Sequence, residues 1–139
     1  MNMLREFGEI IISNCSIGVK STIEIVRHDF EGTIVKEEVV NGWISFYLEK
    51  VMILGQEFSA RLMFSPPGKL AFIFLALTID GKQPKWENWN EKTEQIRNER
   101  QNQFLEKLAG NPPYDFEWGE IVSDISVQSG NASITIRYK

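Results

Sequence analysis

The sequence predicts an α+β fold in which a mostly antiparallel sheet of five or six strands packs on one long helix. Three strand-like segments follow one another with turns of two or three residues between them, and strands joined in this way pair antiparallel. A segment of helical spacing follows from about residue 88 to 109 and stops at Gly110-Asn111-Pro112-Pro113. Two further strand-like segments complete the chain. The three early strands are expected at residues 43–54, 57–65 and 69–79.

Size and composition favour one folded domain spanning residues 1–139. Apolar residues make up 42% and charged residues 24%, as in folded domains rather than disordered chains. The formal net charge is −4, and the lysines and arginines are scattered among acids. Nucleic-acid binding usually needs a basic surface that displaces counterions, so we expect no nucleic-acid partner.

The first forty residues carry a weaker pattern. Residues 8–13 favour a short strand. Residues 19–30 have apolar side chains at helical spacing around a Ser21-Thr22-Ile23-Glu24 capping sequence, but their β-branched residues favour a strand. Of these alternatives we prefer a short N-terminal helix. Residues 32–42 predict a short strand and a loop.

The turn Pro66-Pro67-Gly68 sets an expected register for the two strands beside it. Counting back from the turn gives four pairs on the helix-facing side: Phe64/Leu70, Leu62/Phe72, Ala60/Phe74 and Phe58/Ala76. Residues 70–79 are apolar on both sides, which predicts a central strand. On the other face, Ile73, Leu75 and Leu77 then need cover from the short helix, a curled sheet or a second protein molecule.

The long helix is expected to begin at Asn88 or Asn90, either of which can cap it. Glu94 and Arg97 are one turn apart and are expected to pair on its exposed face. Its apolar stripe consists of Trp89, Thr93, Ile96, Phe104, Leu105 and Leu108.

The C-terminal strands show regular alternation with one interruption. Tyr114, Phe116 and Trp118 alternate on one face, whereas the apolar residues after Gly119 have the opposite parity, which predicts a β-bulge at this glycine. The last strand has one apolar face made of Ala132, Ile134, Ile136 and Tyr138.

Several C-terminal motifs resemble those of a group of small bacterial proteins with no assigned activity. They are Trp86-x-x-Trp89, Pro112-Pro113-Tyr114, Trp118-Gly119-x-Ile121-x-Ser123 and Ser133-Ile134-x-Ile136-x-Tyr138. The group tends to have an Asp-Pro-Arg-Ser-Gly turn, whereas this chain has Ser126-Val127-Gln128-Ser129-Gly130. The resemblance covers residues 86–139 and implies a bacterial, cytoplasmic, single-domain protein. It implies no activity.

Two sets of residues are candidates for catalytic groups. Cys15 and His28 are the only candidates for a thiol–imidazole pair. The simpler interpretation is that Cys15 is a small buried side chain and His28 a surface histidine. The acids Asp115, Glu117, Glu120 and Asp124 could serve acid–base chemistry or bind a cation, but alternation places them on the solvated side of a strand. We therefore expect no catalytic residue, metal site or cofactor, and no enzyme.

The location of the protein follows from its single cysteine and its apolar runs. Cys15 has no partner for an intrachain disulfide, which suits a reducing cytoplasm. The longest apolar run, residues 70–79, is about half of the roughly 20 residues that a membrane-spanning helix needs. We expect no membrane insertion, and no signal peptide is apparent.

The aromatic residues near the start of the long helix suggest a binding surface, since partly buried aromatic side chains are enriched in binding hot spots. The predicted binding residues are Trp86, Trp89, Tyr114 and Trp118. The expected function is a non-enzymatic binding or interaction protein with a protein partner or a second copy, such as a homodimer. An immunity-type inhibitor of a partner protein is one version. The alternative is a small-molecule binding module, with an apolar pocket lined by Phe58, Phe72, Phe74 and Trp118.

Overall fold

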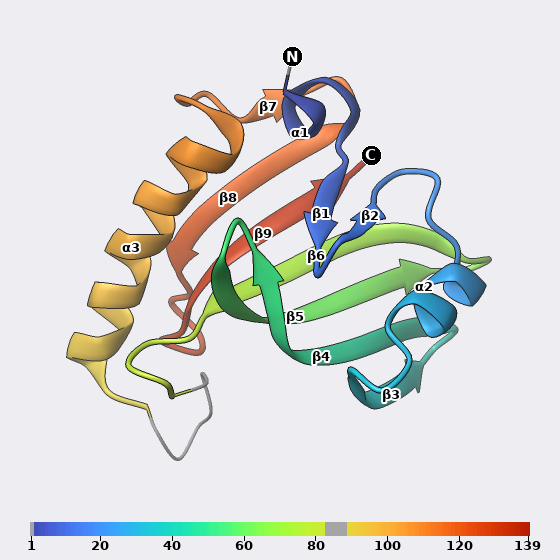
Figure 1. Cartoon of the computed structure of the whole chain (residues 1–139), viewed down its shortest axis with the longest axis horizontal. Coiled ribbons are helices and arrows are strands. Elements are labelled where there is room, and N and C mark those ends of the chain that lie inside the picture. Colours follow the sequence, from blue (N-terminus) through green and yellow to red (C-terminus); the bar gives the residue numbers. More distant parts are fainter. Residues whose placement is uncertain (1, 83–88) are drawn as a thin grey trace.

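The computed structural model describes residues 2–82 and 89–139. It contains three helices and nine strands in these two ranges (Figure 1). The helices are α1 (Met3–Phe7), α2 (Ile23–Asp29) and α3 (Glu91–Ala109). The strands are β1 (Ile10–Ile12), β2 (Cys15–Ile17), β3 (Ile34–Val40), β4 (Trp43–Ile53), β5 (Gln56–Ser65), β6 (Lys69–Leu77), β7 (Asp115–Phe116), β8 (Gly119–Ile125) and β9 (Ala132–Tyr138).

The predicted α+β class with a mostly antiparallel sheet is confirmed, but the sheet has seven strands rather than five or six. Their order is β3-β4-β5-β6-β9-β8-β7, and every neighbouring pair is antiparallel. β6 is central, as its apolar sequence predicts. The two-residue strand β7 was too short to recognise by its pattern. β1 and β2 form a separate hairpin.

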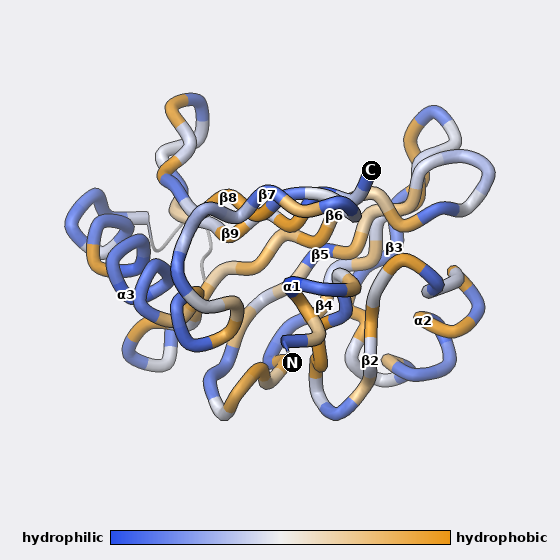
Figure 2. The backbone as a smooth tube through the Cα atoms, turned by 90° about the horizontal axis from the view of Figure 1, so that it is seen from above, coloured by the Kyte–Doolittle hydropathy of each residue, from blue (hydrophilic) through white to orange (hydrophobic). Residues whose placement is uncertain are grey.

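The helices and the β1–β2 hairpin lie on one side of the sheet, and no described segment forms a second layer on the opposite side (Figure 2). The core lies between these two layers. Its largest fully buried side chains include Phe30, Phe46, Phe58, Phe64 and Phe104. Phe58 of β5 packs against Phe104 of α3 with their ring centroids 4.8 Å apart. The short helix preferred over residues 19–30 is present as α2, with the Thr22 side chain capping its start.

The register predicted for β5 and β6 is wrong beyond the first pair. Phe64 lies opposite Leu70 as expected, but the next pair is Met63 with Phe72, so Ala71 is an extra residue. An extra residue forms a β-bulge and exchanges the two faces of the strand beyond it. The helix-facing pairs are therefore Leu62/Ile73, Ala60/Leu75 and Phe58/Leu77. Phe72 and Phe74 point to the open face, and Ile73, Leu75 and Leu77 are core residues that need no further cover.

The change in side-chain alternation at Gly119 arises from a hairpin between β7 and β8 rather than from the predicted bulge. Phe116 of β7 pairs with Gly119 of β8, so Glu117 and Trp118 form the turn between them. Gly119 is required by a close backbone approach, because a Cβ atom there would lie 1.9 Å from the carbonyl oxygen of Arg137. The inward set predicted for the last strand is confirmed, with Ala132, Ile134, Ile136 and Tyr138 all buried.

The long helix begins at Glu91, after the cap Asn90, and its buried face differs from the predicted stripe. Glu94 and Arg97 do form an ion pair, but it is buried rather than exposed. Arg97 Nε donates to the Leu77 carbonyl oxygen at 2.7 Å, and Glu94 Oε1 accepts from the Ala132 amide at 3.0 Å. Gln101 Oε1 accepts from the Leu77 amide at 2.9 Å. Polar side chains of α3 thus satisfy the backbone at the ends of β6 and β9.

Candidate functional site

The structure separates the aromatic residues that were predicted to form one binding surface. Trp89 precedes α3 and donates from Nε1 to the Gly130 carbonyl oxygen at 3.3 Å. Tyr114 and Trp118 lie beyond the other end of this 19-residue helix, which is about 28 Å long. Trp86 lies outside the described residues. Trp89 therefore shares no surface with Tyr114 and Trp118.

Trp118 anchors the N-terminal segment to the sheet. Its ring lies 5.2 Å from that of Phe116 and 5.3 Å from that of Tyr138, and its Nε1 donates to the Arg5 carbonyl oxygen at 3.0 Å. Gly8 passes directly over this ring, since a Cβ atom there would lie 2.7 Å from it. These contacts give Trp118 a packing role. The Tyr114 hydroxyl similarly donates to the Gly110 carbonyl oxygen at 2.9 Å.

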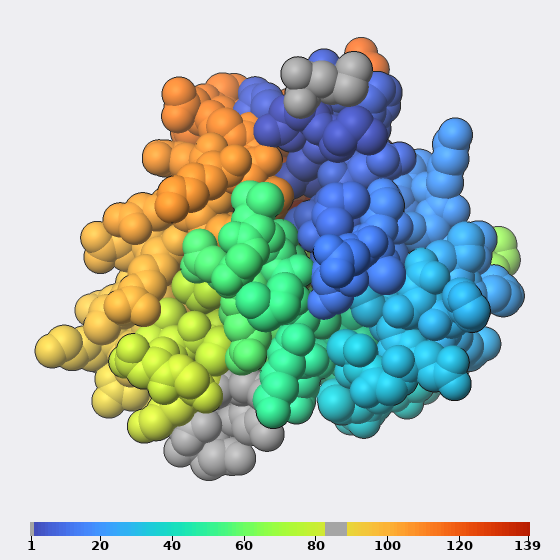
Figure 3. Space-filling view, viewed as in Figure 1, coloured from blue at the N-terminus to red at the C-terminus, as the bar shows by residue number. Residues whose placement is uncertain are grey.

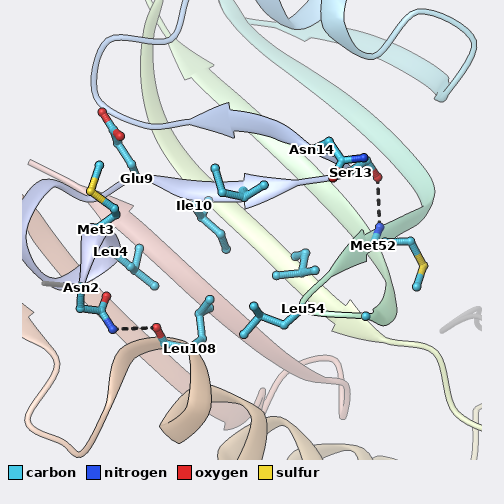
Figure 4. A pocket seen from close by; sticks show the side chains of 13 residues that line it. Asn2, Met3, Leu4, Glu9, Ile10, Ser13, Asn14, Met52, Leu54 and Leu108 are labelled. Atoms are coloured by element: carbon cyan, nitrogen blue, oxygen red, sulfur yellow. Dashed lines mark hydrogen bonds between the residues drawn. The ribbon is translucent and has the colours of Figure 1, made fainter.

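A cleft of about 690 Å³ lies on the helix side of the sheet. Figure 4 shows its walls, which come from α1, from β1 and its turn, from the β4–β5 turn and from the end of α3. In the space-filling view, the N-terminal segment and the β4–β5 hairpin meet at this surface (Figure 3). The lining residues are Asn2, Met3, Leu4, Glu9, Ile10, Ile11, Ser13, Asn14, Met52, Ile53, Leu54, Gly55 and Leu108.

The cleft has a buried apolar floor and an exposed apolar rim. Leu4, Ile10 and Ile53 are almost completely buried and form the floor. The rim contains large apolar side chains with high exposure: Met3 at 46%, Ile11 at 56%, Met52 at 44% and Leu54 at 63%. Four such side chains around one concavity form an apolar surface of the kind that marks binding sites.

Tight turns and hydrogen bonds hold the cleft open. The Ser13 amide donates to the Met52 carbonyl oxygen at 2.8 Å, and the Met52 amide donates to Ser13 Oγ at 3.0 Å (Figure 4). Asn2 Nδ2 donates to the Leu108 carbonyl oxygen at 3.0 Å and fixes α1 to α3. These bonds satisfy local polar groups, so the apolar walls dominate the chemistry that the cleft offers.

Sequence reasoning missed this cleft because its residues come from four separate segments. The one available signal was the apolar run that ends in Leu54-Gly55, where a large apolar residue occupies a turn. Leu54 has φ +47 and Gly55 has φ +78, which are turn conformations that project the Leu54 side chain away from the core.

The open face of the sheet carries a second, shallower groove of about 350 Å³. Phe72 stacks on Phe74 at 5.5 Å and lies 6.4 Å from the ring of Trp43. The Arg61 guanidinium lies 5.1 Å from the ring centroid of Tyr47, and both its Nε and its Nη2 donate to Ser45 Oγ. These side chains form a structured aromatic surface that no described helix or strand covers.

The apolar pocket predicted from sequence does not form from the four residues named for it. Phe58 is fully buried on the helix side, while Phe72 and Phe74 lie on the open face. Trp118 is at the N-terminal junction. The physical reason is the bulge at Ala71, which places the aromatic residues of β6 on the face opposite Phe58.

The catalytic candidates considered in the sequence lack the geometry that their chemistry needs. Cys15 lies near the end of α2, where its Sγ is 3.9 Å from the Asp29 carbonyl oxygen. Burial, and then the Asp29 carboxylate, raise the pKa of the Cys15 thiol, which is opposite to what a nucleophile requires. His28 is exposed on the same helix.

The four candidate acids do not converge on one point. Asp115 lies opposite Glu120 in the β7–β8 pair, and Glu120 forms an exposed ion pair with Arg137 at 3.2 Å. Glu117 lies in the turn, and Asp124 faces Ser133 farther along β8. Within residues 2–82 and 89–139, no group of three or more His, Cys, Asp or Glu side chains is placed to hold a metal ion.

Comparison with protein families, with curated proteins and with solved structures finds no match to this chain. The resemblance to small bacterial proteins therefore stays a prediction from the C-terminal motifs. In the part of the chain that the structure describes, no helix combines the length and the apolar character needed to span a membrane.

Proposed function

We propose that this chain is a non-enzymatic binding protein of the bacterial cytoplasm, and that its cleft takes an apolar segment of a protein partner. The observation that carries the proposal is the ring of Met3, Ile11, Met52 and Leu54 around one concavity, each with at least two fifths of its surface exposed. A single exposed apolar residue is common on protein surfaces. Four of them around one cleft of 690 Å³ expose apolar area, and a ligand that buries this area gains binding free energy.

The chemistry of the rim favours a protein segment as the occupant. Methionine side chains are flexible and polarizable, and they recur at surfaces that accept apolar helices or strands of partner proteins. The cleft is partly open to solvent, which leaves access for a segment of a partner chain. Glu9 adds an acid at one end, which favours a basic residue beside the apolar anchors of the partner.

An immunity-type inhibitor, which occludes the active site of a partner, is one specific form of this proposal. The net charge of −4 is compatible with a basic partner. A toxin gene beside the gene for this chain would support this form, and its absence would leave the broader binding function to be tested directly.

A photo-crosslinking amino acid at position 52 tests the proposal. Crosslinking in the native host should capture a protein at position 52 but not at the control position 122, which is an exposed valine on the open face of β8. Leu54→Glu should abolish the capture at position 52, because it places a charge in the apolar rim. Equal capture at both positions, or none at position 52, would contradict the proposal.

A small apolar molecule is the second candidate occupant, since the cleft volume lies within the usual range for ligand sites of about 300–1,000 Å³. The neutral dye Nile red separates the two. Saturable binding of the dye that Leu54→Glu removes, together with no captured protein, would favour the small-molecule function.

A further inference from the structure

The strand β3 forms one edge of the seven-stranded sheet, and no other strand in residues 2–82 and 89–139 pairs with its outer side. All three of its valines are more than half exposed: Val35 at 57%, Val39 at 63% and Val40 at 55%. β3 contains no proline, and its sequence is Ile34-Val35-Lys36-Glu37-Glu38-Val39-Val40. An edge strand of this length presents unpaired backbone groups to which another strand can pair, provided that the charges at its centre are matched.

The turn that follows β3 determines which of its backbone groups face outward. Asn41 and Gly42 have φ +52 and +83 and form a two-residue hairpin turn between Val40 and Trp43. In such a turn the Val40 carbonyl accepts from the Trp43 amide. Bonding alternates along an antiparallel pair, so the N–H and C=O groups of Glu37 and Val39 point away from β4.

The side chains of β3 are complementary to a second, antiparallel copy of themselves. A register centred on Glu37 sets Lys36 opposite Glu38 of the second copy, and Glu38 opposite Lys36. The same register sets Val35 opposite Val39, and Ile34 opposite Val40, each twice by symmetry. Because Glu37 lies at the centre, its outward N–H and C=O groups meet those of Glu37 in the second copy, as an antiparallel ladder requires.

The central pair of acids has countercharges already in place. Glu37 forms an ion pair with Arg27 of α2 in each chain, so two guanidinium groups flank the symmetry axis. Within one chain, Lys36 Nζ lies 3.1 Å from Glu38 Oε2, and both side chains are on the same face of the strand. In the dimer, each of these side chains also lies opposite the oppositely charged residue of the second copy. The β3–β4 register shifts at Val35, so the dimer pairs that lie wholly within the regular part of β3 are those of residues 36–38.

We propose that two copies of this chain associate through antiparallel β3–β3 pairing centred on Glu37, which joins their sheets into one continuous sheet. Charge complementarity between Lys36 and Glu38 selects a second copy of this chain as the occupant of the edge. The dimer is independent of the cleft, because the two surfaces share no residue.

Variants with reversed charges at positions 36 and 38 test the proposed register of the dimer. Sedimentation of the wild-type chain should show a reversible dimer. Lys36→Glu and Glu38→Lys each place like charges in both symmetric pairs, and each should weaken the dimer roughly tenfold. An equimolar mixture of these two variants should form a heterodimer, because every acid at positions 36 and 38 of one chain then faces a lysine of the other. The double variant Lys36→Glu/Glu38→Lys should also regain the dimer.

Two further variants complete the experiment. Glu99→Lys has the same net charge as Glu38→Lys but lies exposed on α3, and it should dimerise like the wild type. Val39→Pro removes an outward N–H group and should give a folded monomer with an unchanged circular dichroism spectrum. A wild-type chain that stays monomeric, single variants that dimerise normally, or a mixture that stays monomeric would each overturn the proposal.

Discussion

Arg97 binds Glu94 one helical turn before it, with 3% and 5% of the two side chains exposed. The same two side chains hydrogen bond to the backbone at the ends of β6 and β9. This buried ion pair thus joins α3 to two strands of the sheet. A helix with little apolar surface in its first half is held in place by polar contacts instead.

Removal of Arg97 should destabilise the fold strongly. Arg97→Met leaves the Glu94 carboxylate buried without its counterion, and we expect a loss of about 3–5 kcal/mol in the free energy of unfolding. Urea denaturation followed by circular dichroism measures this loss. Arg100→Met, on the exposed face of the same helix, should change stability by less than about 0.5 kcal/mol. A similar result for both variants would contradict the structural role of the pair.

Gly119 should not tolerate a side chain. Gly119→Ala forces a methyl group against the Arg137 carbonyl, and the backbone must shift at a cost near the upper end of the roughly 1–3 kcal/mol range for overpacking. Gly32→Ala is the comparison, since no atom lies within 4 Å of a Cβ at that position and only its φ of +84 opposes alanine. Thermal unfolding should rank Gly119→Ala as clearly the less stable variant.

Tyr138 should make the fold sensitive to alkaline pH. Its hydroxyl donates to the Gly8 carbonyl oxygen at 2.7 Å, and burial, then the Glu9 carboxylate, raise the pKa of this phenol well above its usual value. The folded state therefore favours the neutral phenol. Its contribution is complete below about pH 10, where an unfolded tyrosine begins to ionise, and is lost as pH rises toward the folded pKa.

Tyr138→Phe provides the measurement for this prediction. The variant should lose about 1 kcal/mol at neutral pH, because the hydrogen bond to Gly8 is gone. Between pH 9 and 11 its unfolding midpoint should fall less steeply than that of the wild type. Parallel curves for the two proteins would show that Tyr138 does not determine the alkaline transition.

Cys15 should react slowly with thiol reagents. Burial and the Asp29 carboxylate keep its thiol protonated, so alkylation by iodoacetamide should require a higher pH than alkylation of an exposed thiol in a peptide. Asp29→Asn should shift the pH profile of the reaction downward by removing the nearby charge. An unshifted profile would mean that burial alone sets the reactivity of this thiol.

Local patterns were sufficient to predict elements whose side-chain period is uninterrupted. The last strand alternates without a break from Ala132 to Tyr138, and its inward face is as predicted. Burial of one face fixes the period of this strand, so its sequence reveals its geometry. α2 is present as preferred, with the Thr22 side chain at its start, although its β-branched residues also allowed a strand.

The errors arose where tertiary contacts override the local period. Nothing in the residues around Ala71 indicates a bulge, because apolar residues lie at both parities of β6. The local sequence predicts Glu94 and Arg97 as a surface pair. Their burial depends on the ends of β6 and β9, which are distant in the sequence. The cleft was not predictable for the same reason, because its four walls come together only in the fold.

The bulge at Ala71 determines which aromatic side chains of β6 are exposed to water. If residues 70–77 alternated strictly with Ala71 in place, Phe72 and Phe74 would lie on the helix side and Ile73 and Leu75 on the open face. Deletion of this alanine would leave all four where they are, because Phe72 would then follow Leu70 directly. The aromatic character of the uncovered face thus depends on the strand accommodating one surplus residue locally, and a shorter chain that lacks this alanine should keep the same rings in water.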